Sequence, residues 1–258
     1  MKISEKRCVV LDMDGTVYLG NIPIRGAVDF IRNNWDRLDF HFLSNNTSKA
    51  PDTYVKKLNG MGIPATLDLI LSPTTPLVHF LKTHGIHTAY IVGNRDFCRD
   101  LAQRMPELAQ QEEGAQAVIL AYDTELTYEK LSRSALLLEN HPNVLFLATH
   151  PDKVCPSPEG PLPDVGSMLA LYKVATGREP QYIFGKPDPA VLEPLTSKYR
   201  REDMVMAGDR LSTDKKLAEN AGIDFILVLS GEATLEEALA ESIQPTVIAE
   251  DLGKAWEE

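Results

Sequence analysis

The chain alternates short, uninterrupted hydrophobic runs with stretches in which hydrophobic positions recur at helical spacing. The first run, residues 8–11, meets no polar position before Asp12, a pattern typical of a strand buried on both faces of a parallel sheet. Because such strands alternate with helices along the sequence, the pattern indicates an α/β fold in which a doubly wound parallel sheet carries helices on both faces.

The same pattern places the individual elements. Strands are predicted at residues 8–12, 39–43, 69–71, 89–92, 117–120, 144–147, 204–207, 225–229 and 246–248. Helices are predicted at residues 26–37, 51–60, 75–84, 96–104, 128–139, 167–175, 189–199 and 213–220. A proline-rich loop is predicted at 151–163, and Gly222 supplies a stop signal for the helix before it.

The middle of the chain is expected to form a unit of its own. At 258 residues the chain exceeds the usual domain size of about 100–150 residues. We predict a Rossmann-like core made of residues 1–78 and 183–258, interrupted by an inserted α/β cap domain at 79–182. No internal repeat or low-complexity tract appears in the sequence.

Composition narrows the classes of function. The formal net charge of −11 argues against a nucleic-acid partner, which would need basic patches. An anionic substrate would therefore need local positive charge or a metal ion. The three cysteines form no metal-ligand pattern. No apolar run reaches the roughly 18 residues that span a bilayer, so we expect no membrane partner and a cytoplasmic protein.

Four groups of polar residues follow predicted strand ends or lie in the loops after them, where open α/β sheets form their ligand crevice. They are Asp12 with Asp14, Ser44 with Asn45, Lys186 in a Gly-Lys-Pro turn, and Asp209 with Asp214. Taken singly, each has an ordinary structural interpretation as a solvated loop acid, a helix cap or a surface charge. Their shared position in the predicted fold is the reason to interpret them together as one site.

The chemistry of this set suits phosphoryl transfer. Asp12, Asp209 and the carbonyl of Asp14 offer hard oxygen ligands, which favour Mg²⁺. A carboxylate beside a metal can attack phosphorus and carry it as an acyl phosphate. Asp14 can exchange a proton with the leaving oxygen. Ser44, neighbouring backbone amides and Lys186 would neutralise the phosphoryl oxygens.

The four groups resemble the ordered motifs of the haloacid dehalogenase (HAD) superfamily. The matching segments are Asp12-Met-Asp14-Gly-Thr16, Ser44-Asn-Asn, Gly-Lys186-Pro and Gly-Asp209-Arg-Leu-Ser-Thr-Asp214. The combination Ser-Asn-Asn-Thr-Ser with Gly-Asp-Arg-Leu-Ser-Thr-Asp is similar to subfamily IIA, the NagD-like and p-nitrophenyl phosphatase-like enzymes. The resemblance covers nearly the whole chain, including an α/β cap inserted between the second and third motifs.

The resemblance implies a Mg²⁺-dependent phosphatase that hydrolyses small phosphate monoesters through an aspartyl-phosphate. Sugar phosphates, nucleoside monophosphates and polyol phosphates all fit as the small phosphorylated metabolite. Asp12 would be the nucleophile, Asp14 the general acid/base, and Ser44 and Lys186 the groups that hold the phosphoryl. The implied metal ligands are Asp12, Asp14 through its carbonyl, and Asp209, with Asp214 supporting them. Relatives often dimerise, so the resemblance also admits a homodimer.

The resemblance extends to further phosphate- and substrate-binding positions, namely Gly15, Thr16, Asn45, Asn46 and His150. The segment Thr149-His150-Pro151-Asp152 is similar to the Thr-Asn-Pro-Asp substrate loop of the family, with histidine where asparagine is usual. His150 is thus expected to contact substrate; the alternative is an exposed loop histidine without a role. A second departure is Lys215, which stands where an apolar residue is common.

Two other functions are compatible with parts of this pattern. A phospho-accepting signalling module also combines acids, a hydroxyl residue and a lysine on a doubly wound sheet. Such modules lack the acid two residues after the phosphorylated aspartate, so Asp14 argues against this hypothesis. The other alternative is a non-catalytic binding or regulatory protein that keeps the fold without the activity. All motif residues are present, which favours the enzyme.

Overall fold

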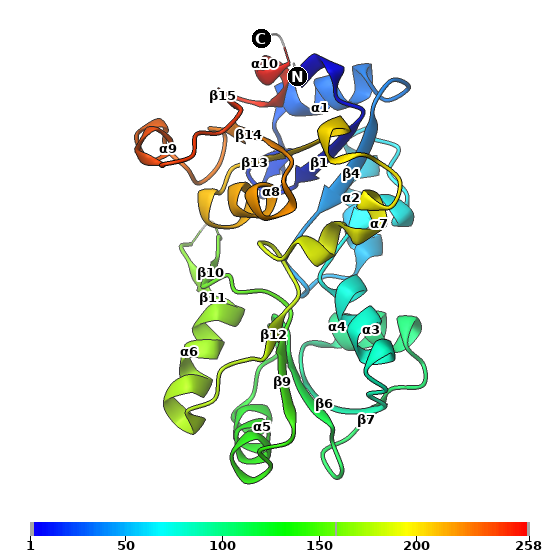
Figure 1. Cartoon of the computed structure of the whole chain (residues 1–258), viewed down its shortest axis with the longest axis vertical. Helices are drawn as coiled ribbons and strands as arrows, with labels where there is room; N and C mark the ends of the chain where they lie inside the picture. The colour runs from blue at the N-terminus through cyan, green and yellow to red at the C-terminus, as the bar shows by residue number, and fades with distance from the viewer. Residues whose placement is uncertain (1–2, 158, 257–258) are drawn as a thin grey trace. The chain divides into compact units, whose positions relative to one another are not determined.

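The computed structural model describes residues 3–157 and 159–256, which divide into two compact units (Figure 1). The core unit comprises Met1–Ser44, Asp52–Leu71 and Lys186–Glu258, and the inserted unit comprises Asn45–Pro51 and Ser72–Gly185. Segments 45–51, 72–78 and 183–185, which were predicted to belong to the core, therefore group with the inserted unit. Pro158 of the predicted proline-rich loop and the chain's first two and last two residues lie outside the described residues.

The core unit is built on a six-stranded parallel sheet with strand order β15-β14-β13-β1-β4-β5. The strands are β1 (Cys8–Asp12), β4 (Asp39–Leu43), β5 (Ile70–Leu71), β13 (Met204–Gly208), β14 (Asp224–Val228) and β15 (Val247–Ala249). Their side chains alternate between two hydrophobic clusters, Val9 and Leu11 entering one and Cys8 and Val10 the other. Both faces of the sheet are thus buried, as the uninterrupted hydrophobic runs predict.

Helices cover both faces of this sheet. They are α1 (Arg25–Asn33), α2 (Pro51–Gly60), α7 (Glu193–Thr196), α8 (Lys216–Ala221), α9 (Leu235–Ala240) and α10 (Leu252–Ala255). The single helix predicted at 189–199 is wrong: the chain forms a 3₁₀ turn at Pro189–Leu192 followed by the short α7. Pro194 explains the break, because proline has no amide for a continuing helix. The helix predicted at 213–220 instead begins as a π-turn, Leu211–Lys215, and continues as α8.

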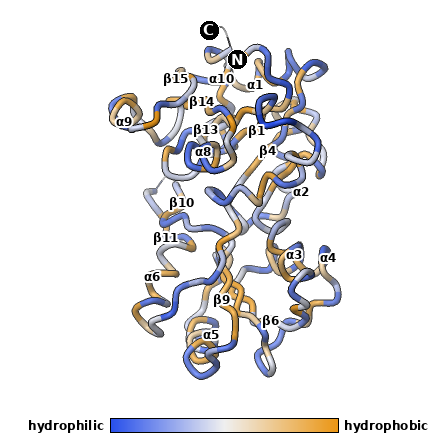
Figure 2. Tube along the Cα trace, in the orientation of Figure 1, coloured by the Kyte–Doolittle hydropathy of each residue, from blue (hydrophilic) through white to orange (hydrophobic). Residues whose placement is uncertain are grey.

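The inserted unit repeats the architecture on a smaller scale. Its parallel five-stranded sheet has the order β12-β9-β8-β6-β7. The strands are β6 (Thr88–Val92), β7 (Ala109–Gln110), β8 (Ala117–Leu120), β9 (Leu145–Ala148) and β12 (Tyr182–Ile183). The helices are α3 (Thr74–Thr83), α4 (Arg95–Arg104), α5 (Tyr128–Asn140) and α6 (Val165–Thr176). Figure 2 shows β9 as a hydrophobic strand, and its residues enter the clusters beneath these helices.

Two small antiparallel hairpins were not predicted. One pairs β2 (Tyr18–Leu19) with β3 (Ile22–Pro23) directly after the first motif, and the other pairs β10 (Val154–Cys155) with β11 (Leu162–Pro163) inside the proline-rich loop. Strands of two residues are too short to display an alternating pattern, which is why the sequence did not reveal them. Among the described residues, no helix combines the length and hydrophobicity needed to cross a membrane.

Candidate active site

Two neighbouring strands deliver the first and last motifs to the same edge of the core sheet. β1 ends at Asp12, and β13, its hydrogen-bonded neighbour, runs into Asp209. The chain turns away from β1 at Gly15, whose φ of 92° lies in the region that favours glycine. A Cβ at Gly15 would also collide with the Asp209 carboxylate, so the close approach of the two motifs requires glycine there.

Three buried carboxylates converge at this edge. Asp12, Asp209 and Asp214 each place an oxygen within 4.8 Å of the others. Asp209 Oδ2 accepts a hydrogen bond from the Glu232 amide over 2.8 Å, whereas buried Oδ1 has no hydrogen-bond partner among the described residues. An unsatisfied buried carboxylate oxygen beside two further carboxylates is the environment that a hard cation would complete.

Lys186 lies among these acids. Its Nζ donates to Asp12 Oδ1 over 2.5 Å and to Asp214 Oδ1 over 2.6 Å, and the lysine is itself buried. Asp214 Oδ2 also accepts from the Arg210 amide over 3.1 Å, which ties the π-turn to its own carboxylate. The interpretation of Lys186 as a solvated surface charge is therefore wrong.

The ammonium of Lys186 alone does not balance the negative charge of the three carboxylates. Burial, followed by repulsion from Asp214 and Asp209, raises the pKa of Asp12 to about 8 even though Lys186 acts to lower it. Burial and Asp214 raise the pKa of Asp209 to about 6. Burial alone would lower the pKa of Lys186, but attraction by Asp12 and Asp214 outweighs it and leaves that pKa above its ordinary value.

The donor set fits Mg²⁺. Three ionised carboxylates and one ammonium leave two negative charges, which a divalent cation would balance. The donors are all oxygens, and the cluster includes no histidine or cysteine that would favour zinc. Two predicted ligands, Asp12 and Asp209, thus lie together with Asp214, which was predicted to support them, and their binding of Mg²⁺ stays a prediction.

The remaining predicted core residues lie around this cluster. Asp14 is exposed, and its Oδ1 accepts from the Gly20 amide over 3.2 Å. Ser44 follows β4, the other sheet neighbour of β1, so it reaches the same edge as Asp12. Thr16 is buried, and its hydroxyl has no partner within the part of the chain that the structure describes.

The other predicted positions belong to the inserted unit. Asn45 donates through Nδ2 to the two carboxylate oxygens of Asp152 over 3.2 and 3.3 Å. Asn46 accepts through Oδ1 from the amide and the hydroxyl of Ser48. Both asparagines thus hold local structure, and their predicted contact with phosphate or substrate stays a prediction.

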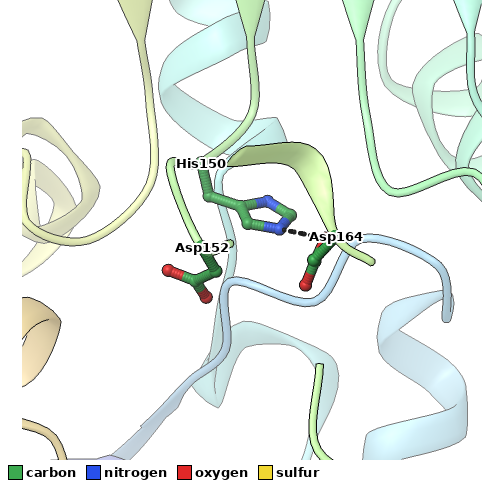
Figure 3. A group of neighbouring side chains, drawn as sticks. All are labelled: His150, Asp152 and Asp164. Carbon is green, nitrogen blue, oxygen red and sulfur yellow. Dashed lines mark hydrogen bonds and ion pairs between the residues drawn. The ribbon is translucent and has the colours of Figure 1, made fainter. Parts of the chain in front are cut away.

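His150 is neither exposed nor poorly bonded. Its ring is fully buried, with Nδ1 2.9 Å from Thr149 Oγ1 and Nε2 3.0 Å from Asp164 Oδ1. Figure 3 shows the carboxylates of Asp152 and Asp164 flanking the imidazole. Because both ring nitrogens are engaged, this geometry favours a role in holding the loop over direct contact with substrate, and it removes the alternative of an exposed loop histidine.

The same three side chains could in principle hold a metal ion, since His150, Asp152 and Asp164 place donor atoms within 4.8 Å of one another. However, Asp164 Oδ1 also caps α6 by accepting from the Val165 amide over 2.6 Å. The Nε2 atom is likewise occupied by Asp164. The group is therefore satisfied as a hydrogen-bonded network.

The loop that follows β14 also contacts the site and was not predicted. Ser230 donates to the Gly15 carbonyl over 2.6 Å, and the Glu232 amide binds Asp209. A Cβ at Gly231 would collide with Asp209, so this loop packs directly on the carboxylate. The signal was available, because Ser230-Gly-Glu232 follows the predicted strand 225–229 as the other motifs follow theirs.

The chain is similar to several known proteins. Residues 9–104 match the model of a haloacid dehalogenase-like hydrolase, and residues 183–255 match a HAD-hydrolase-like model. The acid sugar phosphatase of Staphylococcus saprophyticus is 32% identical over 256 residues, covering 98% of this chain and 97% of the relative.

Solved structures extend the similarity to the whole fold. The 4-nitrophenylphosphatase of Thermotoga maritima superposes with a TM-score of 0.92 at 36% identity, covering 99% of this chain and 98% of that one. The glycerol phosphate phosphatase of Mycobacterium tuberculosis, solved in complex with magnesium, has a TM-score of 0.88 at 29% identity, covering 100% of this chain and 80% of that one.

Proposed function

The chain belongs to the haloacid dehalogenase-like hydrolases of subfamily IIA, and on that premise we propose that it is a Mg²⁺-dependent phosphatase of small phosphate monoesters. The observation that carries the proposal is the buried cluster of Asp12, Asp209 and Asp214 around Lys186. Three ionised carboxylates can lie this close together in a protein interior only when cations accompany them. Such a cluster suits a site built for a metal and an anionic substrate.

Asp12 is the nucleophile in this proposal. One carboxylate oxygen attacks phosphorus, the ester P–O bond breaks, and the phosphoryl group is held as an acyl phosphate. Asp14 donates a proton to the departing oxygen and then takes one from the water that hydrolyses the intermediate, which regenerates Asp12 and releases phosphate. The exposure of Asp14 leaves its carboxyl accessible for both transfers.

Charge balance supports the remaining roles. Lys186 reaches Asp12 directly, so its ammonium lies where the phosphoryl oxygens would be neutralised. We propose that Asp12, Asp209 and the carbonyl of Asp14 hold Mg²⁺, with Asp214 fixing Lys186. When bound, the ion supplies positive charge that offsets repulsion between the nucleophile and the substrate dianion.

The similar proteins favour particular substrates. One is an acid sugar phosphatase and another a glycerol phosphate phosphatase, which supports sugar or polyol phosphates over nucleoside monophosphates here. Selection of the substrate by the inserted unit stays a prediction.

A panel of esters tests the proposal. Purified protein with Mg²⁺ should hydrolyse p-nitrophenyl phosphate and at least one sugar or polyol phosphate, and EDTA should stop both reactions. Activity that survives exhaustive chelation would contradict the metal requirement. Absence of turnover across the panel would favour the non-catalytic alternative.

A further inference from the structure

The β2–β3 hairpin follows the first motif and is bonded back to it. The Gly15 amide donates to the Tyr18 carbonyl over 2.7 Å, and the Gly20 amide donates to Asp14 Oδ1 over 3.2 Å. Gly20 has a φ of 57° at the turn of the hairpin, a conformation that suits glycine. Because Asp14 is exposed and not fixed by packing, the direction of its carboxylate depends on where this turn lies.

Lys57, on α2, holds the turn from a distant part of the sequence. Its Nζ donates to the Gly20 carbonyl over 2.5 Å and lies 3.3 Å from the centroid of the Tyr18 ring. A cation over the face of an aromatic ring is attracted by it. Tyr18 is almost fully buried, so the ring is a fixed platform for the ammonium.

We propose that Lys57 is a positioning residue for Asp14 and acts through Gly20. The carbonyl of Gly20 accepts from Lys57 while its amide donates to Asp14, so fixing the turn also fixes the carboxyl that transfers the proton. The inference rests on the proposed function, because it assigns Lys57 to the acid/base half of that chemistry. Asp12, the last residue of β1, and Asp209, which directly follows β13, are held independently of this turn.

Lys57→Met tests the proposal, because it removes the ammonium but keeps an unbranched chain that can cover Tyr18. General acid catalysis contributes about 10²–10⁴-fold, so a misplaced acid should lower kcat for an alkyl phosphate by about 10-fold or more. p-Nitrophenolate leaves without a proton, so kcat for p-nitrophenyl phosphate should fall at least about 5-fold less. It loses only what the hydrolysis of the acyl phosphate, a step common to both esters, owes to Asp14. The alkyl ester is the best sugar or polyol phosphate of the panel.

Lys56→Met is the matched control. Lys56 is the next residue of α2, is largely exposed and pairs with Asp52, so its loss should change neither reaction. Lys57→Arg should restore much of the alkyl phosphatase activity, since a guanidinium can both stack on Tyr18 and donate to Gly20.

Two results would overturn the inference. Equal losses on both esters would make Lys57 a merely structural residue. The second such result is a double variant, Lys57→Met with Asp14→Asn, whose kcat is lower than that of Asp14→Asn alone. A residue that acts only through Asp14 should have no further effect once the Asp14 carboxyl is gone. Circular dichroism checks folding, and Lys57→Gln carries the same comparison if Lys57→Met is unstable. A wild-type protein that hydrolyses neither ester would instead overturn the proposed function.

Discussion

At the scale of single residues, the site concentrates more negative charge than one lysine can balance. Asp12 is the carboxylate whose charge state matters most, since it must be ionised to attack phosphorus. Its Oδ1 accepts a hydrogen bond from Lys186, and its carboxylate lies near those of Asp209 and Asp214. A neutral amide at this position would keep the shape and remove the chemistry.

Asp12→Asn should abolish turnover, because an amide cannot form the acyl phosphate. Loss of a covalent nucleophile should cost at least about 10³-fold in kcat. The variant should remain folded, since Lys186 keeps Asp214 as a partner and one buried charge is removed. The assay is kcat on p-nitrophenyl phosphate, with exposed Asp36→Asn as a control. A variant with a tenth of wild-type activity would rule Asp12 out as the nucleophile.

Asp14→Asn should depend on the leaving group. An alkoxide leaves poorly without a proton, whereas p-nitrophenolate leaves readily, so the loss should be larger on a sugar phosphate than on p-nitrophenyl phosphate. The ratio of the two kcat losses is the measurement. A ratio of one would demote Asp14 to a structural or metal-orienting role.

At the scale of elements, the loop at 149–152 and helix α6 are joined by a buried pair. Asp164 caps α6 and also binds His150, so one carboxylate fixes the helix start and the loop together. Because Asp164 bonds both the loop and the helix, the loss of its histidine partner should lower the stability of the protein rather than change substrate binding.

His150→Asn should therefore lower the free energy of unfolding by about 1–3 kcal/mol, the cost of leaving a buried group unsatisfied. The exposed His87→Asn is the matched control and should leave stability unchanged. Chemical denaturation measures both, and a substrate panel is run in parallel. Unchanged stability with an altered substrate ranking would restore the hypothesis that His150 contacts substrate.

The elements also show what a sequence can and cannot reveal. The runs at β1, β4 and β13 are long enough for their burial to be visible in the sequence. The polar residues that end or follow them, Asp12, Ser44 and Asp209, could be placed from it. The loop at 230–232 binds Asp209 through a backbone amide, so only its position after a predicted strand, and no side-chain motif, could have indicated it. The partner of His150 was missed for a different reason: Asp164 is distant in sequence and resembles an ordinary helix cap.

At the scale of the whole molecule, the chain has a net charge of −11 and would repel a phosphate dianion. Local positive charge at the site is what allows such a substrate to bind. Positive charge is concentrated at one sheet edge by Lys186 and, in our proposal, by Mg²⁺. The metal should therefore contribute to stability as well as to catalysis, and its contribution should vary with pH.

The direction of that variation follows from the raised pKa values. Folding raises the pKa of Asp12 from 3.8 to about 8 and that of Asp209 from 3.8 to about 6. Between pH 3.8 and about 8, the metal-free folded protein therefore binds protons that the unfolded chain has released. The contribution of these two carboxylates to its free energy of unfolding then falls as pH rises through this window. Mg²⁺ neutralises the ionised carboxylates, so it should raise Tm more at about pH 8 than at about pH 5.5.

Thermal unfolding with EDTA and with saturating Mg²⁺ measures this difference. Ligand at about 100 times its Kd stabilises by about 2.7 kcal/mol, which corresponds to a Tm rise of roughly 5–10 °C for a chain of this size. Asp209→Asn is the control: it removes a proposed ligand, so Mg²⁺ should shift its Tm by much less at either pH. A shift in the wild-type protein that is equal at both pH values, or larger in acid, would mean that the ion binds outside the cluster of Asp12, Asp209 and Asp214. The repulsion that raises the two pKa values would then have to be relieved by Lys186 and by protonation alone.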